Sequence, residues 1–425
     1  MSSSNDALRA SRATRDRVPY HLVMSKGVTL EAIRAARKRI GKEIYHSPCP
    51  YSLSLSRLCG CEIYCKMEHL QVTGRFKERG ARNKLKQLDE AQKRAGVIAA
   101  SAGNHALALA YHGRELGVGV TVVMPKYAPL VKVSNCRSFG ANVILCGDSF
   151  QEAKDHAMAL KEEKGLVYVH GFDDEQIIAG AGTLGLEILE DVPDVDAVIV
   201  PIGGGGLIAG IGTAVKALKP AVRIIGVEPK NAPTMHDSLK RGVVTRVQPL
   251  PTLADGLAVG EAGRLSLEIT RQVMDELVML DEVQIATAIL RLLELEKTVV
   301  EGAGATPLAG AIVKAEALKG KKVVLVLAGG NIDVNIISRI IERGLAADGR
   351  LCRVTAYVPD RPGSLARLLS IIAGTGASIK EVNHDRNFGP ADIARVAISC
   401  IMETRDFQHV EEIRKVLREA GIEFD

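Results

Sequence analysis

The sequence predicts an α/β fold, in which helices cover both faces of parallel β-sheets, followed by a small C-terminal domain of mixed α and β structure. Between about residues 30 and 347, short apolar runs rich in β-branched residues alternate with helical patterns. Two of the apolar runs are followed by loops of small residues, 101–105 and 203–206, that lead into helical segments. Such loops lie at the carboxyl ends of parallel strands, where α/β folds bind their ligands.

The expected strands of the α/β region are continuous apolar runs, as in parallel sheets that are buried on both faces. They are residues 96–100, 119–124, 142–145, 197–200, 222–227 and 322–327. The segments between them carry apolar residues at helical spacing. The expected helices include residues 105–116, 151–164, 207–218 and 281–296.

The pattern changes after residue 345, where Ala346-Ala347-Asp348-Gly349 is typical of a linker. The rest of the chain predicts the element order βαββαβ, which is typical of a small ferredoxin-like domain. Its expected strands are residues 351–358, 378–385, 392–402 and 422–424, and its expected helices are residues 364–374 and 405–420.

Composition indicates an ordinary globular protein. Hydrophobic residues make up 47% of the 425 residues and charged residues 25%, and the net charge is only +5. No long basic run concentrates that charge, so we expect neither a nucleic-acid partner nor a membrane partner. The uncharged segment 197–215 is nearly long enough to span a bilayer, but Pro201 and several glycines favour strand, loop and helix instead.

The first 27 residues contain Ser and Arg but no apolar core of a secretory signal. Asp6 and Asp16 argue against a mitochondrial presequence, so we expect a disordered arm and a cytoplasmic protein, with a mitochondrial location as the alternative. Eight scattered cysteines fit a reducing compartment. The cluster at 49, 59, 61 and 65 has no zinc-finger spacing, and alternation along 61–67 favours buried thiols in a strand.

Two segments supply complementary chemistry. Lys77 is an amine that can condense with an aldehyde, although a lysine among other charges is ordinarily a solvated helix residue. Gly203 to Gly206 stand between a strand-like run and a helix-like run, where backbone N–H groups can converge on an anion, although a glycine run can also be a flexible turn. Pyridoxal phosphate carries both an aldehyde and a phosphate, and would use both groups.

The run Lys66-Met67-Glu68-His69-Leu70-Gln71-Val72-Thr73-Gly74-Arg75-Phe76-Lys77-Glu78-Arg79-Gly80-Ala81-Arg82-Asn83 closely resembles the cofactor-lysine segment of the threonine dehydratase/serine racemase family. These are fold-type-II pyridoxal-phosphate enzymes with a tryptophan synthase β-like fold. The resemblance implies that Lys77 is the catalytic residue and binds the cofactor covalently. The cofactor-binding residues that it implies are Phe76, Lys77, Asn104, Gly203, Gly204, Gly205, Gly206, Leu207 and Ala328.

The loop after the first of these strands resembles the family's substrate loop. The resemblance implies that its N–H groups hold the substrate carboxylate and that Asn104 also hydrogen-bonds the cofactor hydroxyl. The residues concerned are Ser101, Ala102, Gly103, Asn104 and His105. Serine racemases carry serine at the position of Ala102, where it serves as a second acid/base. Alanine there favours elimination over racemisation.

Ala328 departs from the family pattern. Relatives commonly have serine, and sometimes cysteine or threonine, at this position, facing the pyridine nitrogen of the cofactor. Alanine cannot donate that hydrogen bond. A water or another side chain is then needed to face the nitrogen, and a pyridine without a proton withdraws electrons less strongly.

A cation site is implied at the segment that begins at Glu228. This glutamate and the carbonyl of Ala232 match the cation ligands of serine racemases, whereas Thr234 replaces their aspartate. Oxygen ligands suit Mg²⁺ or Ca²⁺, and a monovalent cation is a further alternative. An ordinary glutamate at a strand end, with no cation, is equally compatible with the residues.

Residues 358–365 and 376–379 resemble the ACT domain, a small amino-acid-sensing module. The resemblance implies a small-molecule effector pocket and at least a homodimer, with a homotetramer as the larger alternative. A dimerisation module without a ligand is the other interpretation. We thus expect an arm at 1–27, a catalytic region at 28–346 with a smaller subdomain at roughly 66–160, and an ACT-like regulatory domain at 350–425.

The resemblance implies dehydration and deamination of L-threonine to 2-oxobutyrate and ammonia, and of L-serine to pyruvate, under control of the ACT domain. Racemisation of serine or dehydration of hydroxyaspartate on the same cofactor is one alternative. An amino-acid-sensing regulator that has lost activity is the other, and Ala328 is its only support in the sequence.

Overall fold

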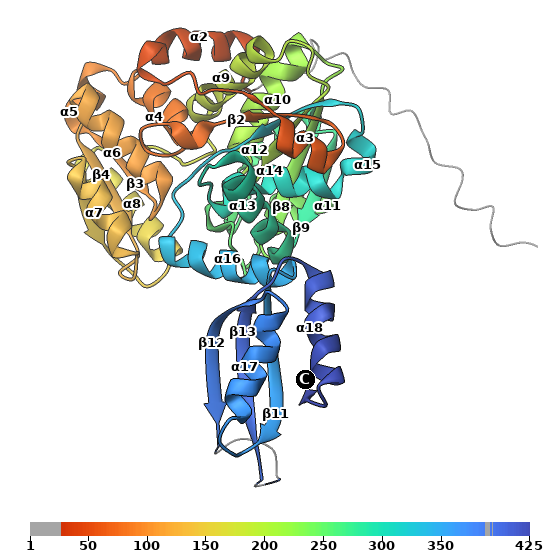
Figure 1. The fold of residues 1–425 in the computed structure, drawn as a ribbon. Helices are drawn as coiled ribbons and strands as arrows, with labels where there is room; N and C mark the ends of the chain where they lie inside the picture. Colours follow the sequence, from red (N-terminus) through yellow and green to blue (C-terminus); the bar gives the residue numbers. More distant parts are fainter. Residues whose placement is uncertain (1–26, 387–391, 393) are drawn as a thin grey trace, which may run out of the picture. The chain divides into compact units, whose positions relative to one another are not determined.

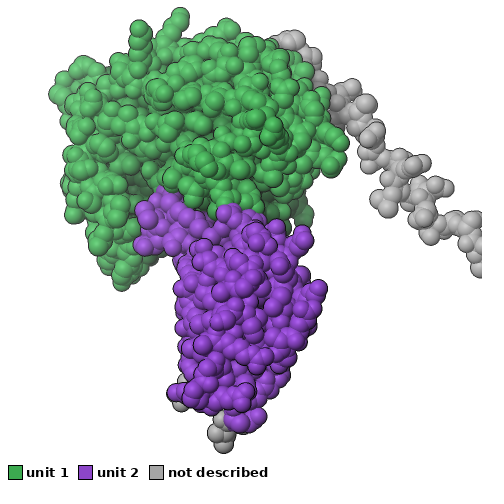
Figure 2. Space-filling model, in the orientation of Figure 1, with its two compact units in different colours: residues 1–331 green, residues 332–425 purple. Residues whose placement is uncertain are grey.

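The computed structural model describes residues 27–386, 392 and 394–425 (Figure 1). The chain divides into two compact units, residues 1–331 and 332–425 (Figure 2). The N-terminal arm expected at 1–27 lies outside the described residues, apart from Gly27.

The first unit contains a six-stranded sheet with the order β1-β2-β10-β7-β8-β9. Only the β1–β2 pair is antiparallel; the other pairs are parallel. The central strands are almost wholly buried, which explains their continuous runs of Val, Ile and Leu. The strands are β1 (Tyr51–Ser52), β2 (Glu62–Lys66), β7 (Ala197–Pro201), β8 (Arg223–Pro229), β9 (Glu276–Leu280) and β10 (Lys322–Val326).

A second, four-stranded sheet of the same unit is entirely parallel, with the order β5-β4-β3-β6. Its strands are β3 (Val97–Ala100), β4 (Val120–Met124), β5 (Asn142–Leu145) and β6 (Val167–Tyr168). Helices lie against both sheets (Figure 1). The buried side chains around β3 and β4 form cores separate from the core around β7 and β10.

The longer helices of the first unit begin after polar caps or glycine-rich loops. Thr29, Ser149 and Asp174, for example, each accept a hydrogen bond from the first turn of the following helix. The helices are α2 (Leu30–Ile40), α3 (Leu53–Cys59), α4 (Lys77–Leu85), α5 (Glu90–Ala95), α6 (Asn104–Leu116), α7 (Leu130–Ser138), α8 (Phe150–Lys164), α9 (Glu175–Asp191), α10 (Gly206–Leu218), α11 (Thr234–Arg241), α12 (Arg264–Val273), α13 (Glu282–Glu296), α14 (Gly302–Val313) and α15 (Ala315–Leu318), with the 3-10 turns η1 (Gly41–Glu43), η2 (Glu68–Leu70) and η3 (Asp255–Leu257).

Three helices, α4, α9 and α10, pack at unusually close range because glycines meet at their contacts. A Cβ atom at Gly180 of α9 would lie 2.5 Å from the Arg79 carbonyl oxygen and 2.7 Å from the Cα of Gly80 in α4. On the other side of α9, a Cβ at Gly210 of α10 would lie 2.6 Å from the amide nitrogen of Gly182. Glycine is therefore required where these backbones touch, and α9 joins the other two helices tightly.

The second unit begins with helix α16, after which a four-stranded antiparallel sheet and two further helices follow in the predicted βαββαβ order. The sheet order is β12-β13-β11-β14, and residues along β11 and β13 alternate between more and less buried, as expected for a sheet packed on one face. The elements are α16 (Val334–Ala347), β11 (Leu351–Pro359), α17 (Ser364–Gly374), β12 (Ser378–Asp385), β13 (Arg395–Glu403), α18 (Phe407–Glu419) and β14 (Glu423–Phe424).

The expected elements agree closely with the observed ones. Helix 364–374 and strands 142–145 and 378–385 have the predicted bounds, and the other predicted strands differ by a few residues at their ends. The expected catalytic region extends to residue 346, whereas the first compact unit ends at residue 331 and α16 belongs to the second unit, where it contacts β11. The predicted α/β class with a C-terminal ferredoxin-like unit is confirmed. Among the described residues, no helix is both long and apolar enough to cross a bilayer.

We predict that Gly180→Ala destabilises the first unit, because the added methyl group has no room between α9 and α4. Overpacking of this kind costs about 1–3 kcal/mol in the free energy of unfolding, measured by denaturant titration. Gly119→Ala is the matched control, because a Cβ there would meet no atom within 4 Å. Equal stability of the two variants would contradict the close helix contact.

Candidate active site

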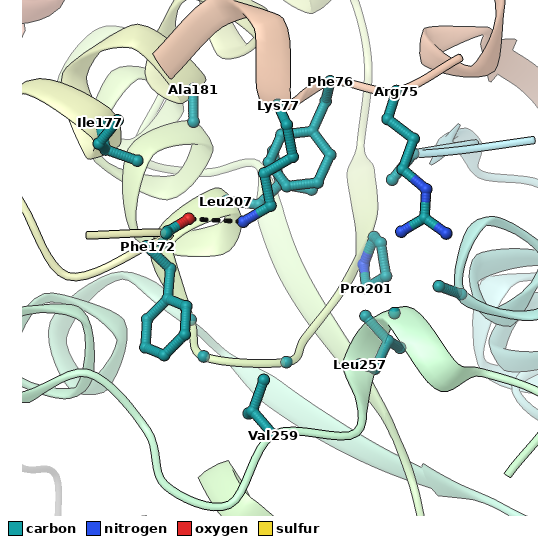
Figure 3. Close-up of a pocket in the computed structure, with 18 of the residues that line it drawn as sticks. Arg75, Phe76, Lys77, Phe172, Ile177, Ala181, Pro201, Leu207, Leu257 and Val259 are labelled. Atoms are coloured by element: carbon teal, nitrogen blue, oxygen red, sulfur yellow. Dashed lines mark hydrogen bonds between the residues drawn. The ribbon is translucent and has the colours of Figure 1, made fainter. Parts of the chain in front are cut away.

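A pocket lies at the carboxyl ends of β7 and β10, where Pro201 and Ala328 form part of its wall (Figure 3). This is the position at which parallel α/β sheets bind ligands. Its walls come from the start of α4, the loop after β6, the first turns of α9, the glycine run before α10, the segment around η3, the start of α14 and the end of β10. The lining residues are Arg75, Phe76, Lys77, Gly171, Phe172, Ile177, Ala181, Pro201, Gly203, Gly204, Gly205, Gly206, Leu207, Gly256, Leu257, Val259, Glu301, Ala303 and Ala328.

Lys77 is the first residue of α4, and its amine reaches into the pocket (Figure 3). The Nζ donates a hydrogen bond to the Gly171 carbonyl at 2.6 Å. It also lies 5.0 Å from the ring centre of Phe76 and 5.9 Å from that of Phe172. Burial, helped by the nearby charge of Arg75, lowers the pKa of Lys77 to about 8, so the amine is more readily neutral and nucleophilic than an exposed lysine.

The segment that precedes α4 is held against the end of β10. Arg75 and Gly329 form an isolated antiparallel bridge, and the Phe76 amide donates to the Ala328 carbonyl at 3.2 Å. Asn331 adds a side-chain contact, because its Nδ2 donates to the Thr73 carbonyl at 2.9 Å. The backbone that leads into Lys77 is thereby fixed to the end of the strand that leads to Ala328.

Helix α4 itself is held in place by a buried cluster of charged side chains. Arg79 is fully buried between two carboxylates and donates to both oxygens of Glu68 at 2.8 Å, and to those of Glu187 at 2.6 and 2.8 Å. Although burial opposes the charge of Arg79, these carboxylates raise its pKa. Lys66 also contacts Glu187, at 2.9 Å, which balances the charge of the second carboxylate. The cluster ties α4 to β2 and α9.

The glycine run turns the chain from β7 into α10. Gly205 has a φ of 95°, and a Cβ at Gly206 would lie 2.5 Å from the Phe172 carbonyl oxygen. A side chain at Gly204 would clash with the ring of Phe172. The first N–H groups of α10 have no intrahelical acceptor and carry the positive end of the helix dipole, so they form a cradle for an anion.

The predicted substrate loop adjoins the pocket but does not line it. Asn104 begins α6, and its Oδ1 accepts a hydrogen bond from Asn331 Nδ2 at 2.9 Å. The Nε2 of His105 donates to the Val169 carbonyl at 3.0 Å, and burial lowers the pKa of this imidazole to about 3. His105 is therefore neutral at pH 7, and its ring packs against Gly171, whose carbonyl binds Lys77.

Three residues in or beside the pocket, Gly171, Phe172 and Asn331, have no role that the sequence predicts. Gly171 and Phe172 belong to a loop without a recognisable motif, in which the Nδ1 of His170 accepts hydrogen bonds from the amides of Phe172 and Asp173, at 3.3 and 2.9 Å. Asn331 stands within a run that was singled out only for Ala328. Proximity to Ala328 is the only sequence signal for Asn331, and Gly171 and Phe172 have none.

Glu228 lies outside the pocket lining and serves as a helix cap. Its two carboxylate oxygens accept hydrogen bonds from the amides of Met235 and His236, at 2.7 and 2.9 Å, in the first turn of α11. Burial raises the pKa of Glu228 to about 8. Ala232 is also buried. Within the described ranges, no group of three or more His, Cys, Asp or Glu side chains could hold a metal ion, and all eight cysteines are free.

The pocket suits a group with an aldehyde and a phosphate. It offers an amine of lowered pKa for the aldehyde and an N–H cradle at the start of α10 for the phosphate. Between them, Phe76, Leu207 and Ala328 supply apolar surface for a flat ring. A Cβ in the cradle would clash with neighbouring atoms, so the glycines are required by the geometry as well as suited to the ligand.

Comparison with known proteins agrees with this geometry. The chain is 48% identical to an L-threonine ammonia-lyase of Thermotoga maritima over 93% of its own length and 98% of that protein. A threonine deaminase isoform of Solanum lycopersicum has a similar structure, with a TM-score of 0.71 at 36% identity, covering 74% of this chain and 91% of that one. A serine racemase of Dictyostelium discoideum is also similar, with a TM-score of 0.69 at 36% identity, covering 72% of this chain and 99% of that one.

Residues 40–329 match the family described as pyridoxal-phosphate dependent enzyme, a range that includes the amine, the cradle and the wall at Ala328. This match spans most of the first unit and more than half of the chain. The chain therefore belongs to the family of pyridoxal-phosphate dependent enzymes.

Proposed function

We propose that the protein is an L-threonine ammonia-lyase that converts L-threonine to 2-oxobutyrate and ammonia, and L-serine to pyruvate and ammonia. The observation that carries this proposal is the 48% identity to a named L-threonine ammonia-lyase along 93% of the chain. That match includes much of the C-terminal unit, whereas the similarity to a serine racemase covers 72% of the chain.

The site residues take the following roles in the proposal. Lys77 binds the cofactor aldehyde, and Phe76 and Leu207 contact the cofactor from the pocket wall. The N–H groups of Gly203 to Gly206 hold its phosphate. The start of α6, from Ser101 to His105, holds the substrate carboxylate through its N–H groups, and Asn104 adds a hydrogen bond to the cofactor hydroxyl. The position of Asn104 supports this role, because Asn331 joins it to Thr73 in the segment that leads to Lys77.

Pyridoxal phosphate, when bound, withdraws electrons from the bonds at Cα of a linked amino acid. Lys77 is then free to accept the Cα proton on its Nζ, and its lowered pKa suits an amine that must accept and release a proton near neutral pH. The β-hydroxyl of L-threonine leaves as water. Hydrolysis of the imine that results then gives one 2-oxobutyrate and one ammonia. The apolar walls around Lys77 limit access of other water.

Racemisation of serine is the less supported alternative. A racemase needs a second proton donor on the opposite face of the substrate, and Ala102 has no hydroxyl to serve in that role. Chiral analysis of L-serine after incubation with the enzyme distinguishes the two reactions, because the proposal expects pyruvate and no D-serine. Hydroxyaspartate is tested as a substrate in a separate assay, which follows release of oxaloacetate and ammonia.

The C-terminal unit is proposed to act as an ACT-like regulatory domain that binds a small-molecule effector and joins two or four copies of the chain. Its βαββαβ order supports this proposal. Equilibrium dialysis with amino acids tests the effector, and sedimentation tests the assembly. The cytoplasmic location expected from the sequence stays a prediction.

The cation site at Glu228 and Ala232 also stays a prediction. The cap that Glu228 forms on α11 accounts for its burial without a cation, and a cation would compete for the same oxygens. Thermal melting of the protein with Mg²⁺, Ca²⁺ or K⁺, repeated with Glu228→Gln, tests whether a cation binds there.

We predict that Lys77→Ala abolishes 2-oxobutyrate formation, by at least about a thousandfold, because both the covalent link and the base are lost. The assay follows 2-oxobutyrate from L-threonine, and circular dichroism checks that the variant folds. Lys86→Ala is the control, since Lys86 is exposed just beyond the same helix and should leave activity unchanged. Activity retained in Lys77→Ala would contradict the assignment of Lys77 as the catalytic lysine.

We predict that the cofactor-free protein takes up pyridoxal phosphate faster as the pH rises through about 8. Burial lowers the pKa of Lys77 to about 8, and only the neutral amine, present above that pKa, attacks an aldehyde. Stopped-flow absorbance after removal of the cofactor with hydroxylamine measures this rate. A rise that continues to the pKa of an exposed lysine, about 10.4, would contradict the burial effect.

A further inference from the structure

The pocket contains few polar side chains. Among its lining residues, all within the described part of the chain, only Lys77, Arg75 and Glu301 carry one. Lys77 points to one side, toward the Gly171 carbonyl, and the Arg75 guanidinium points to the other (Figure 3). One side of the pocket therefore has an amine, and the other has a buried ion pair to which neither the sequence nor the proposed function gives a role.

Arg75 is held firmly in this position. Its side chain is only 6% exposed and pairs with the equally buried carboxylate of Glu301. Two glycines make room for it: a Cβ at Gly329 would lie 2.7 Å from Arg75 Nε and 2.6 Å from Glu301 Oε1, and a Cβ at Gly256 would clash with Arg75 Nη1. The pocket is thus shaped around the guanidinium.

The Arg75 Nε is buried and has no hydrogen-bond partner among the described residues. Burying an N–H donor without an acceptor costs about 1–3 kcal/mol, so such a donor is expected to bind something in the working protein. Arg75 also lies close to Ala328, because the bridge between Arg75 and Gly329 places the two segments side by side. Ala328 itself has no donor.

The chemistry of pyridoxal phosphate indicates the acceptor, and this step rests on the proposed function. The ring nitrogen stands opposite the carbon that bears the aldehyde. With the aldehyde at Lys77 and the phosphate in the glycine cradle, the nitrogen is directed away from Lys77. We propose that the Arg75 guanidinium, oriented by Glu301, donates a hydrogen bond to the ring nitrogen, the contact that Ala328 cannot make.

The proposal has a chemical consequence. Burial lowers the pKa of Arg75 to about 9, so at neutral pH its guanidinium keeps its proton, donates to the nitrogen and does not protonate it. The ring nitrogen then stays a hydrogen-bond acceptor, and the ring withdraws electrons less strongly than a protonated pyridine. This favours loss of a β-hydroxyl over racemisation, in agreement with the absence of a hydroxyl at Ala102.

The protonation state of the ring nitrogen can be measured directly by NMR. Protein loaded with ¹⁵N-labelled pyridoxal phosphate, without substrate, is studied by NMR in the wild type, in Arg75→Gln and in Arg75→Gln/Glu301→Gln, which avoids an unpaired buried carboxylate. We expect an unprotonated nitrogen resonance in the wild type that is independent of pH, and a resonance in the variants that moves toward the protonated position as the pH falls. We also expect cofactor affinity to fall about tenfold or more, the loss typical of a charged hydrogen bond.

Two further variants sharpen the test. Ala328→Ser, added to the double variant, should recover part of the lost cofactor affinity, because serine supplies a donor at the neighbouring position. Arg37→Gln is the matched control, since Arg37 pairs with Glu190 at the surface, away from the pocket lining. It should leave both the resonance and the affinity unchanged.

A protonated ring nitrogen in the wild type would overturn the proposal even if no variant folds. Variants that bind the cofactor as the wild type does, with the same resonance, would overturn it as well. If the wild-type protein binds no pyridoxal phosphate, that result would instead contradict the proposed function. Activity alone would not separate these cases, because the charge of Arg75 also influences the pKa of Lys77.

Discussion

The close contact of α9 with both α4 and α10 is the constraint on which the site depends. Lys77 begins α4 and the glycine cradle begins α10, so the spacing between the amine and the anion site is set by how these helices pack. Glycines at both contacts of α9 bring the backbones together without intervening side chains. The Lys77 amine and the glycine cradle come from segments far apart in the sequence, yet rigid helices fix the distance between them.

The charged residues next to Lys77 divide into two kinds. Arg79 is buried in a fully paired cluster with Glu68 and Glu187, where its donors are satisfied and its effect is to fix α4. Arg75, two residues before Lys77, is also buried but leaves its Nε with no partner in the described part of the chain. Removing one member of a satisfied buried cluster lowers the stability of the fold. An unsatisfied donor in a pocket is instead available to form a hydrogen bond with a ligand.

The sequence was most informative where function and local structure coincide. Gly203 to Gly206 could be recognised because they stand at a predictable strand–helix junction, and Lys77 because residues 66–83 resemble the cofactor-lysine segment of a known family. The roles of the Gly171 carbonyl and of Glu301 could not, because each depends on long-range packing that brings a distant loop to Lys77 or Arg75. The cap formed by Glu228 on α11 was missed for a similar reason, since a carboxylate at a strand end has the same local sequence whether it binds a cation or a helix N-terminus.

The most direct test of the central claim is a visible absorbance spectrum of the purified protein with pyridoxal phosphate, before and after L-threonine is added, with 2-oxobutyrate assayed in the same sample. We expect a cofactor band that depends on Lys77, changes on addition of L-threonine and is accompanied by steady release of 2-oxobutyrate. A band that changes without 2-oxobutyrate would contradict threonine as the substrate. Absence of any band would contradict the assignment of the pocket itself.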